Sequence, residues 1–347
     1  MEKQTRRNFL KAAAVATTLT GCAPSQAPNM ELDLPHISPT QAARKRQGTS
    51  KILVARSDDY NDHLFDLIKP HVNELELPSL KGKSCVIKTN MVEIQDGHPI
   101  TTNPAVVKAA CDLANYLGAS EVTIVEGPGH MRDMEYLLTA SGIGPLCKKL
   151  GIRFVDLNVD DVEEVQNIEG FSKFKSIWLP KTVLQAGALI SVPKMKTHHW
   201  IGITSSMKNL LGCIPGKKYG WPKNSVHMYG IKGTTIDLVH LLKPTLALVD
   251  GIVAMEGDGP INGTAKKAGV LVLGDDLAAV DSTCARIMSV PITDLPYIQL
   301  AGEVIGNIDE RHISVLGTPV DSVKQVFELP ITLKNKALLA QSTRSGS

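Results

Sequence analysis

Short hydrophobic runs alternate along the chain with longer stretches in which hydrophobic residues recur every three or four positions. The run at 84–88 is typical of a buried strand. The stretch at 104–117 is typical of an amphipathic helix, with Asn103 as its N-cap, Pro104 at its first position and Gly118 after its end. This alternation predicts an α/β fold, a mostly parallel sheet with helices on both faces.

The same patterns predict further elements up to about residue 288. Strands are expected at 121–126, 152–157, 188–192, 246–250 and 268–273, and helices at 134–139 and 277–288. In such sheets, ligands bind beyond the carboxyl ends of the strands. We therefore expect one shared site from the polar clusters that follow predicted strands, at 88–90, 126–130, 193–199, 250–251 and 274–276.

The N-terminus carries features of an exported protein. Arg6 and Arg7 lie in a basic segment that resembles a twin-arginine signal, and the apolar stretch 12–19 is too short to span a bilayer. Residues 19–22 resemble a bacterial lipobox, in which Cys22 is acylated. We expect a protein exported to the periplasmic side or the cell surface and anchored by a lipid on Cys22. The alternatives are a basic helix and a cleavage site with an incidental cysteine.

Composition then divides the chain into four segments. A signal peptide is expected at 1–21, and a proline-containing tether without aromatic residues at 22–50. A single α/β domain is expected at 51–330 and a flexible tail at 331–347. No apolar run reaches the roughly 18 residues of a membrane-spanning helix, so the sequence excludes a polytopic membrane protein.

Charge and cysteine content exclude two classes of protein. The 347 residues include 37 Lys and Arg against 35 Asp and Glu, and residues after 21 carry 33 basic and 34 acidic side chains. Such balance provides no overall field for nucleic acid. The six cysteines are scattered without a CxxC pair, so no iron–sulfur cluster or zinc knuckle is expected. The cysteines after Cys22 are expected to be buried apolar residues.

The main indication of a site is a segment without acidic residues. From Gly170 to Ile236 the chain has ten lysines and three histidines but no Asp or Glu. These basic residues lie among glycines and turn residues, where free backbone N–H groups also favour an anionic ligand such as a phosphate or carboxylate. The alternative is a basic surface that faces anionic lipid headgroups.

The following segment is acidic. The glycine-rich stretch 250–260 follows a predicted strand, and Asp250, Glu256 and Asp258 in it are candidate ligands for a divalent cation. The spacing is not that of an EF-hand, and turn formation with ion pairs to the basic segment is the alternative. We expect Asp250 or Glu256 within direct or metal-bridged reach of a lysine of the basic segment, at 194, 196 or 208.

Several uncommon strings of this chain occur together in one family. They are KTN at 88–90, TTNP at 101–104, SVPKMKTH at 191–198, GITSSMKNLLG at 202–212, VDG at 249–251, EGDGP at 256–260 and AVD at 279–281. In these strings the chain resembles family 362 of the domains of unknown function, over about residues 51–300. The resemblance implies one α/β domain with a shared polar site and names no reaction. Some members carry ferredoxin modules, but this chain lacks the ferredoxin cysteine pattern.

These observations leave three classes of function open. The first is an enzyme that acts on a small anionic substrate. In it His198 or His227 moves a proton, and Glu126 and Asp250 orient them or hold a metal. Burial among lysines could also turn one lysine into a base. The expected substrate-binding residues are Lys88, Asn90, Thr101, Thr102, Lys194, Lys196, Lys208 and Asn209.

The second class is a non-catalytic lipoprotein that binds a ligand or a protein complex. The third is a redox protein with iron–sulfur partners, for which Gly127 and Gly129 form only part of a nucleotide-binding fingerprint. For each histidine, a hydrogen-bonded structural role is the alternative to catalysis. The cofactor remains open, with a divalent cation as the candidate, and the expected partners are a small anion and a membrane rather than nucleic acid.

Overall fold

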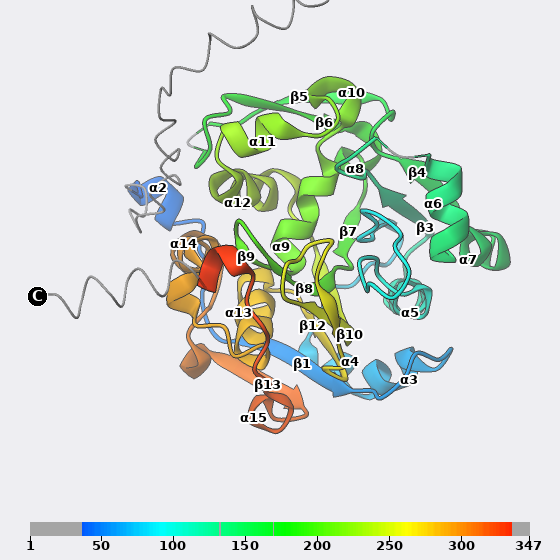
Figure 1. Ribbon diagram of the computed structural model, residues 1–347, viewed down its shortest axis with the longest axis vertical. Coiled ribbons are helices and arrows are strands. Elements are labelled where there is room, and N and C mark those ends of the chain that lie inside the picture. The colour runs from blue at the N-terminus through cyan, green and yellow to red at the C-terminus, as the bar shows by residue number, and fades with distance from the viewer. Residues whose placement is uncertain (1–36, 132, 169, 335–347) are drawn as a thin grey trace, which may run out of the picture. The chain divides into compact units, whose positions relative to one another are not determined.

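A central twisted sheet organises the chain in a computed structural model, which describes residues 37–334 except 132 and 169 (Figure 1). The strands of the sheet follow the order β13-β1-β12-β10-β7-β2-β3-β4. Their bounds are β1 Ser50–Arg56, β2 Ser84–Lys88, β3 Glu121–Glu126, β4 Arg153–Asp156, β7 Ala188–Ser191, β10 Leu246–Glu256, β12 Val270–Gly274 and β13 Ile313–Gly317. The export and anchoring residues Arg6, Arg7 and Cys22 lie outside the described residues.

The sheet is mostly parallel, as predicted. Neighbouring strands from β10 through β7, β2 and β3 to β4 pair in parallel, and β13 pairs in parallel with β1. Strand β12 runs antiparallel to both of its neighbours, β1 and β10. Its carboxyl end therefore emerges at the edge opposite to that of the parallel strands.

This reversal corrects one expectation, that the polar cluster at 274–276 joins the shared site. Asp275 instead forms an ion pair with Arg46 at 2.9 Å. Asp276 accepts hydrogen bonds from the hydroxyl of Ser50 at 2.5 Å and from the backbone N–H of Asn307 at 2.8 Å. These two aspartates therefore hold segments of the fold together and do not belong to the ligand site.

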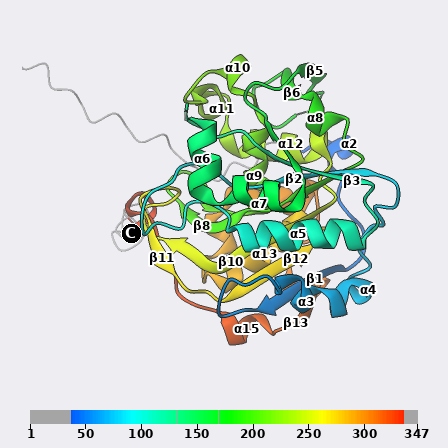
Figure 2. The same ribbon diagram turned by 90° about the vertical axis from the view of Figure 1, so that its right-hand side faces the viewer.

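Helices cover both faces of the sheet, again as predicted (Figure 2). Successive residues of β1 point to opposite faces: Ile52 and Val54 belong to one hydrophobic core and Leu53 to the other. The helices α3 Leu64–Ile68, α5 Pro104–Tyr116 and α7 Ile143–Leu150 pack on the face of Leu53. The other face is covered by α9 Ser206–Asn209, α12 Ile231–Leu242, α13 Leu277–Ile287 and α14 Pro296–Val304.

The remaining elements are short, and β5 Val162–Gln166 and β6 Ser176–Pro180 among them pair in a separate two-stranded sheet. The other strands are β8 Lys194–His198, β9 Gly202–Thr204 and β11 Thr264–Lys266. The α-helices are α2 Pro39–Ala42, α4 Val72–Leu75, α6 Met134–Ser141, α8 Lys181–Leu184, α10 Gly216–Tyr219, α11 Asn224–Met228 and α15 Val320–Val323. The 3-10 turns are η1 Lys69–His71, η2 Leu210–Cys213, η3 Ile292–Asp294 and η4 Glu310–His312.

The folded part extends beyond both ends of the expected domain at 51–330. Ser38 and Gln41 form a capping box at the start of α2, and the backbone N–H of Arg46 donates to the carbonyl of Ile305 at 2.7 Å. At the other end, the backbone N–H of Ile331 donates to Asp258 at 2.9 Å. The last residues of the expected tether and the first of the expected tail thus pack on the domain. Within the described part, no helix is long and apolar enough to cross a membrane.

Candidate functional site

The strand order reverses between β2 and β7. From β2 the chain continues outward to β3 and β4, and it then returns to β7 on the other side of β2. In parallel sheets such a switch point leaves a crevice beyond the carboxyl ends of the strands. Here a cavity of about 300 Å³ is lined by residues that follow β2 and β3, by β8, by α9 and by the segment that leads into α11.

Much of the predicted site meets at this cavity. The expected residues that line it are Lys88, Asn90, Glu126, Lys196, His198, Lys208, Asn209 and Asp258. Lys88 and Lys196 are more than 100 residues apart in the sequence, so the switch point of the sheet brings them together. Their roles in ligand binding or catalysis remain predictions.

Lys88 and Glu126 form a buried ion pair at the cavity. Lys88 Nζ lies 2.5 Å from Glu126 Oε1, and the two side chains are 1% and 2% exposed. The Glu126 carboxylate also accepts from the backbone N–H groups of Met91 at 2.6 Å and Gly127 at 2.8 Å. A side chain at Gly212 would collide with both charged groups. The carboxylate is thus saturated with donors and held in one orientation.

Lys196 is a second buried lysine of the cavity lining. Its ammonium donates to the carbonyl of Ile100 at 2.8 Å. Burial, and then the charges of Lys208 and Lys194, lower the pKa of Lys196 well below its usual value. The protonated form is therefore costly unless an anion enters the cavity.

Lys223 also lines the cavity, although we did not predict it from the sequence. Its side chain is buried, and Nζ donates to the carbonyl of Gly127 at 2.8 Å. Burial lowers the pKa of Lys223 to about 7, an effect that the charge of Lys88 increases and that of Glu126 opposes. In the sequence, only its place in the acid-free segment indicates that Lys223 belongs to the site. That segment holds ten lysines, and their spacing does not show which of them line the same cavity.

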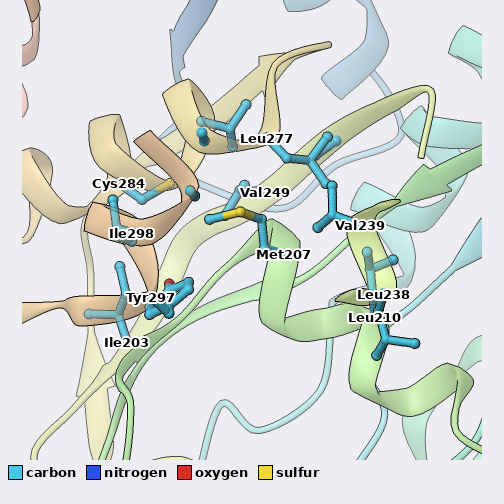
Figure 3. Close-up of a cluster of buried hydrophobic side chains, with 14 of the residues drawn as sticks. Ile203, Met207, Leu210, Leu238, Val239, Val249, Leu277, Cys284, Tyr297 and Ile298 are labelled. Atoms are coloured by element: carbon cyan, nitrogen blue, oxygen red, sulfur yellow. The ribbon is translucent and has the colours of Figure 1, made fainter. Parts of the chain in front are cut away.

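Lys208 and Asn209 are positioned by the short helix α9. Asp281 of α13 accepts from the backbone N–H groups of Ser206 at 2.7 Å and Met207 at 3.3 Å, which fixes the start of that helix. Met207 and Leu210 point into the hydrophobic core, where Met207 lies near Val249 (Figure 3). Asn209 donates to the carbonyl of Lys88 at 3.0 Å. These contacts hold α9, and with it Lys208 and Asn209, in place beside the cavity.

Lys208 differs from the other cavity lysines. Burial, with the neighbouring charge of Lys88, lowers its pKa to about 8. Among the described residues, no hydrogen-bond acceptor or carboxylate pairs with its amine. Lys208 thus supplies an amine that is not held by a partner.

His198 is a buried histidine of the cavity wall. Its Nδ1 accepts from the backbone N–H of Trp200 at 3.1 Å, so the neutral ring carries its proton on Nε2. The ring stacks on His199 with 4.9 Å between centroids. The other predicted histidine, His227, belongs to α11, but its side chain lies outside the described part of the structure.

Two further polar atoms of the wall have no partner. Asn90 Oδ1 and Thr204 Oγ1 are buried and accept or donate no hydrogen bond within the described structure. Both residues line the cavity. Most buried polar groups in proteins are paired, so a partner for these two is expected in a bound molecule.

Lys194 and Asp250 are in direct contact, as expected, but they lie away from the cavity. Lys194 Nζ is 2.5 Å from Asp250 Oδ2, and both side chains are buried. Asp250 also accepts from the hydroxyl of Tyr60 at 2.9 Å and from the backbone N–H of Asn103 at 2.8 Å. Burial lowers the pKa of Lys194, although the attraction of Asp250 opposes that effect. The Asp250 carboxylate is thus engaged in contacts within the fold, and the bond that it accepts from Asn103 stabilises the start of α5.

Two other expected substrate-binding residues also support the fold locally. The Thr101 hydroxyl donates to the carbonyl of Glu93 at 3.1 Å. The Thr102 hydroxyl donates to the carbonyl of Val192 at 2.7 Å and accepts from the backbone N–H of Asn90. Both threonines thereby fix the loop that follows β2.

The three expected metal ligands are not brought together. Glu256 accepts from the backbone N–H of Glu328 at 2.9 Å and pairs with Lys266 at 3.2 Å. Asp258 accepts from Ile331, and Asp250 is occupied by Lys194. Within the described ranges, no group of three or more His, Cys, Asp or Glu residues is placed to hold a metal ion.

The excess of positive charge is the main electrostatic property of the cavity. Lys88, Lys196, Lys208 and Lys223 surround it, whereas Glu126 is the one buried carboxylate among the described lining residues. Transfer of unpaired charges out of water is costly, and the cost falls when the lysines lose protons or when an anion binds. This distribution of charge favours an anionic ligand, and anion binding remains a prediction.

Comparisons with known proteins confirm the family resemblance. The model of the family described as "Domain of unknown function (DUF362)" matches residues 85–286, more than half of the chain. The thylakoid-associated protein sll1697 of Synechocystis sp. is 27% identical over 228 residues, which cover 62% of this chain and 66% of that protein. The match thus spans slightly less than two thirds of the relative.

Two solved structures show partial similarity. The lactate racemase apoprotein from Thermoanaerobacterium thermosaccharolyticum aligns with a TM-score of 0.45 and 13% identity, over 74% of this chain and 60% of that one. A protein from Thermotoga maritima aligns with a TM-score of 0.38 and 13% identity, over 66% of this chain and 59% of that one.

Proposed function

The chain belongs to this family of domains of unknown function, and on that premise we propose that it is an enzyme acting on a small phosphate- or carboxylate-bearing molecule. The observation that carries the proposal is the convergence of Lys88, Lys196, Lys208 and Lys223 on one cavity with a single buried carboxylate. A bound anion would supply the missing negative charge.

The cavity also has the groups that proton transfer requires. Efficient acids and bases have pKa values near the working pH, and burial brings Lys223 to about 7 and Lys208 to about 8. His198 adds an imidazole with a defined tautomer. The Lys88–Glu126 pair holds the Lys88 ammonium in a fixed position. This combination favours catalysis, because perturbed pKa values cluster at catalytic sites.

The size of the cavity limits the ligand. About 300 Å³ lies at the lower end of the range for small-molecule sites. A metabolite with a few carbon atoms and one or two anionic groups fits this volume.

We also propose that the protein is exported and held at a membrane by a lipid on Cys22. The arginine pair, the short apolar stretch and the lipobox-like residues support this location. The Synechocystis relative is a thylakoid-associated protein, which is consistent with this location.

Untargeted substrate screening tests the enzymatic proposal. Purified protein is incubated with a mixture of phosphorylated and carboxylic metabolites, and mass spectrometry follows which compounds disappear and which appear. We expect conversion by the wild type and by Lys217→Met, because Lys217 is an exposed lysine of the same segment. Lys223→Met should lose most of the conversion.

Other outcomes of the same screen would contradict an enzymatic role. Binding of an anion without conversion would favour a non-catalytic ligand-binding lipoprotein. A flavin or nucleotide that copurifies with the exported protein would favour a redox role.

A further inference from the structure

We propose that Lys208 is a nucleophile that forms an imine with the carbonyl group of an anionic substrate, an oxo acid or a phosphorylated aldehyde or ketone. This inference rests on the proposed anion-binding function and assigns it a substrate class. It starts from the different environments of the four cavity lysines.

Three of these lysines have partners that fix their ammonium groups. Lys88 is held by Glu126 and by the carbonyl of Thr89 at 2.7 Å. Lys196 donates to Ile100, and Lys223 donates to Gly127. These groups are suited to hold the anionic part of a ligand, because their positions are set before the ligand binds.

Lys208 has no such partner in the described part of the chain, although its side chain lines the same cavity. An ammonium that is partly buried, lacks an acceptor and faces the charge of Lys88 is destabilised relative to the neutral amine. A neutral amine has a free electron pair, and a neighbouring cation combined with desolvation is a recognised way to activate a lysine nucleophile.

The expected population of neutral amine is substantial. With a pKa of about 8, close to half of the Lys208 amines are neutral at pH 8. An exposed lysine with an ordinary pKa is less than about 1% neutral at that pH. Lys208 should therefore react with carbonyl compounds faster than surface lysines, by at least about tenfold.

The backbone that carries Lys208 is held in place by the contacts of its neighbours. Asp281 fixes the start of α9, and Met207 and Leu210 lie in the hydrophobic core (Figure 3). Positioned nucleophiles gain from such an arrangement, because less orientational freedom is lost when the bond forms.

The reaction needs no further reagent. The nitrogen electron pair attacks the carbonyl carbon, and one N–H proton passes to the oxygen to give a carbinolamine. The C–O bond then breaks, the second N–H proton leaves with that oxygen as water, and a C=N bond remains. The carbinolamine hydroxyl would find hydrogen-bonding groups in the unpaired Thr204 Oγ1 and Asn90 Oδ1.

Lys223 is the competing candidate, since its pKa is lower still. Its amine, however, is engaged by the carbonyl of Gly127, which directs it toward the 126–129 loop. Lys208 has no interaction to break before it attacks. The proposal therefore predicts different reactivity for two lysines of the same cavity, and chemical labelling can measure that difference.

Reductive trapping with glyoxylate, a small anionic aldehyde, tests the proposal. The protein is treated with glyoxylate and sodium cyanoborohydride at pH 8, and peptide mass spectrometry locates the modified lysines over time. We expect the fastest modification at Lys208 and protection by sulfate, which would occupy the anion site. Lys217→Met should be labelled like the wild type, and Lys208→Met should lose the fast phase while it retains a cooperative melting transition.

The competing outcomes have separate meanings. Fast labelling at Lys223, or equal labelling of all exposed lysines, would overturn the assignment of Lys208. If sulfate still raises the melting temperature in that case, the proposed anion-binding function stands and only the imine step fails. If sulfate has no effect and Lys208 is not labelled, both proposals fail.

Discussion

Lys88 Nζ lies 2.5 Å from Glu126 Oε1 at the ends of two adjacent parallel strands, where both side chains are shielded from solvent. This contact neutralises one of the four lysine charges around the cavity. The remaining positive charge comes from Lys196, Lys208 and Lys223, and burial lowers the pKa of each. The predictions below test this distribution of charge.

Loss of the Glu126 carboxylate should destabilise the fold strongly. Glu126→Gln leaves the buried Lys88 ammonium without its counterion, and removal of one partner of a buried ion pair costs about 3–5 kcal/mol. Urea unfolding at pH 7 measures the change. The double variant Lys88→Met with Glu126→Gln should be more stable than Glu126→Gln alone, and a double variant that is no more stable would contradict the electrostatic explanation.

Asp250→Asn provides a contrast, because Asp250 lies outside the cavity lining. The change removes the charge opposite Lys194 and weakens the bonds from Tyr60 and Asn103, so we expect a loss of stability of about 3 kcal/mol or more. Sulfate binding by the folded variant should remain within about twofold of the wild type. Abolished binding in a variant that is still folded would place Asp250 in the ligand site.

Stability should increase with pH above neutrality. Lys223 has a pKa of about 7 in the folded protein against 10.5 as its ordinary value, so the unfolded chain binds more protons between these values. The free energy of unfolding then rises with pH in this window, by up to about 1.4 kcal/mol per unit for one such group. Below pH 7 both states are protonated and this term is constant.

Unfolding of Lys223→Met at pH 7, 8 and 9 isolates this contribution. The variant should show a shallower rise than the wild type, although Lys196 and Lys208 still contribute to the slope. Lys217→Met serves as the exposed control and should keep the wild-type slope. Equal slopes in all three proteins would show that Lys223 keeps an ordinary pKa.

Export and anchoring should depend on separate residues. Replacement of Arg6 and Arg7 by lysine should retain the protein in the cytoplasm, because the twin-arginine pathway recognises that pair. Cys22→Ala should leave export intact but release the protein from membranes. Cell fractionation followed by immunoblotting measures both. Wild-type protein in the soluble fraction would contradict the lipid anchor.

Local patterns sufficed to predict the central elements of the fold. The expected helix at 104–117 is α5, and Asn103 caps it through a bond from the backbone N–H of Ala105. Strands β1 and β13 were harder to predict, because they pair with partners more than 200 residues away along the chain. The antiparallel direction of β12 also has no local signature, and it moved Asp276 to the other edge.

The site could be predicted in outline but not in its division of roles. A stretch without acidic residues indicated a basic site, and it contains Lys196, Lys208 and Lys223. Nothing in the sequence distinguishes Lys194 from Lys196, which lie two residues apart in β8. The fold places Asp250 against the first, whereas the second faces the cavity.

Proton-linked sulfate binding tests the central claim most directly, because the charge of sulfate is constant across the relevant pH range. Calorimetric titration at pH 7.5 is repeated in two buffers that differ in ionisation enthalpy. If buried lysines of low pKa bind the anion, the protein takes up protons on binding, and affinity falls as the pH rises from 7 toward 9. Sulfate binding without proton uptake and with pH-independent affinity, or no binding at all, would contradict the account.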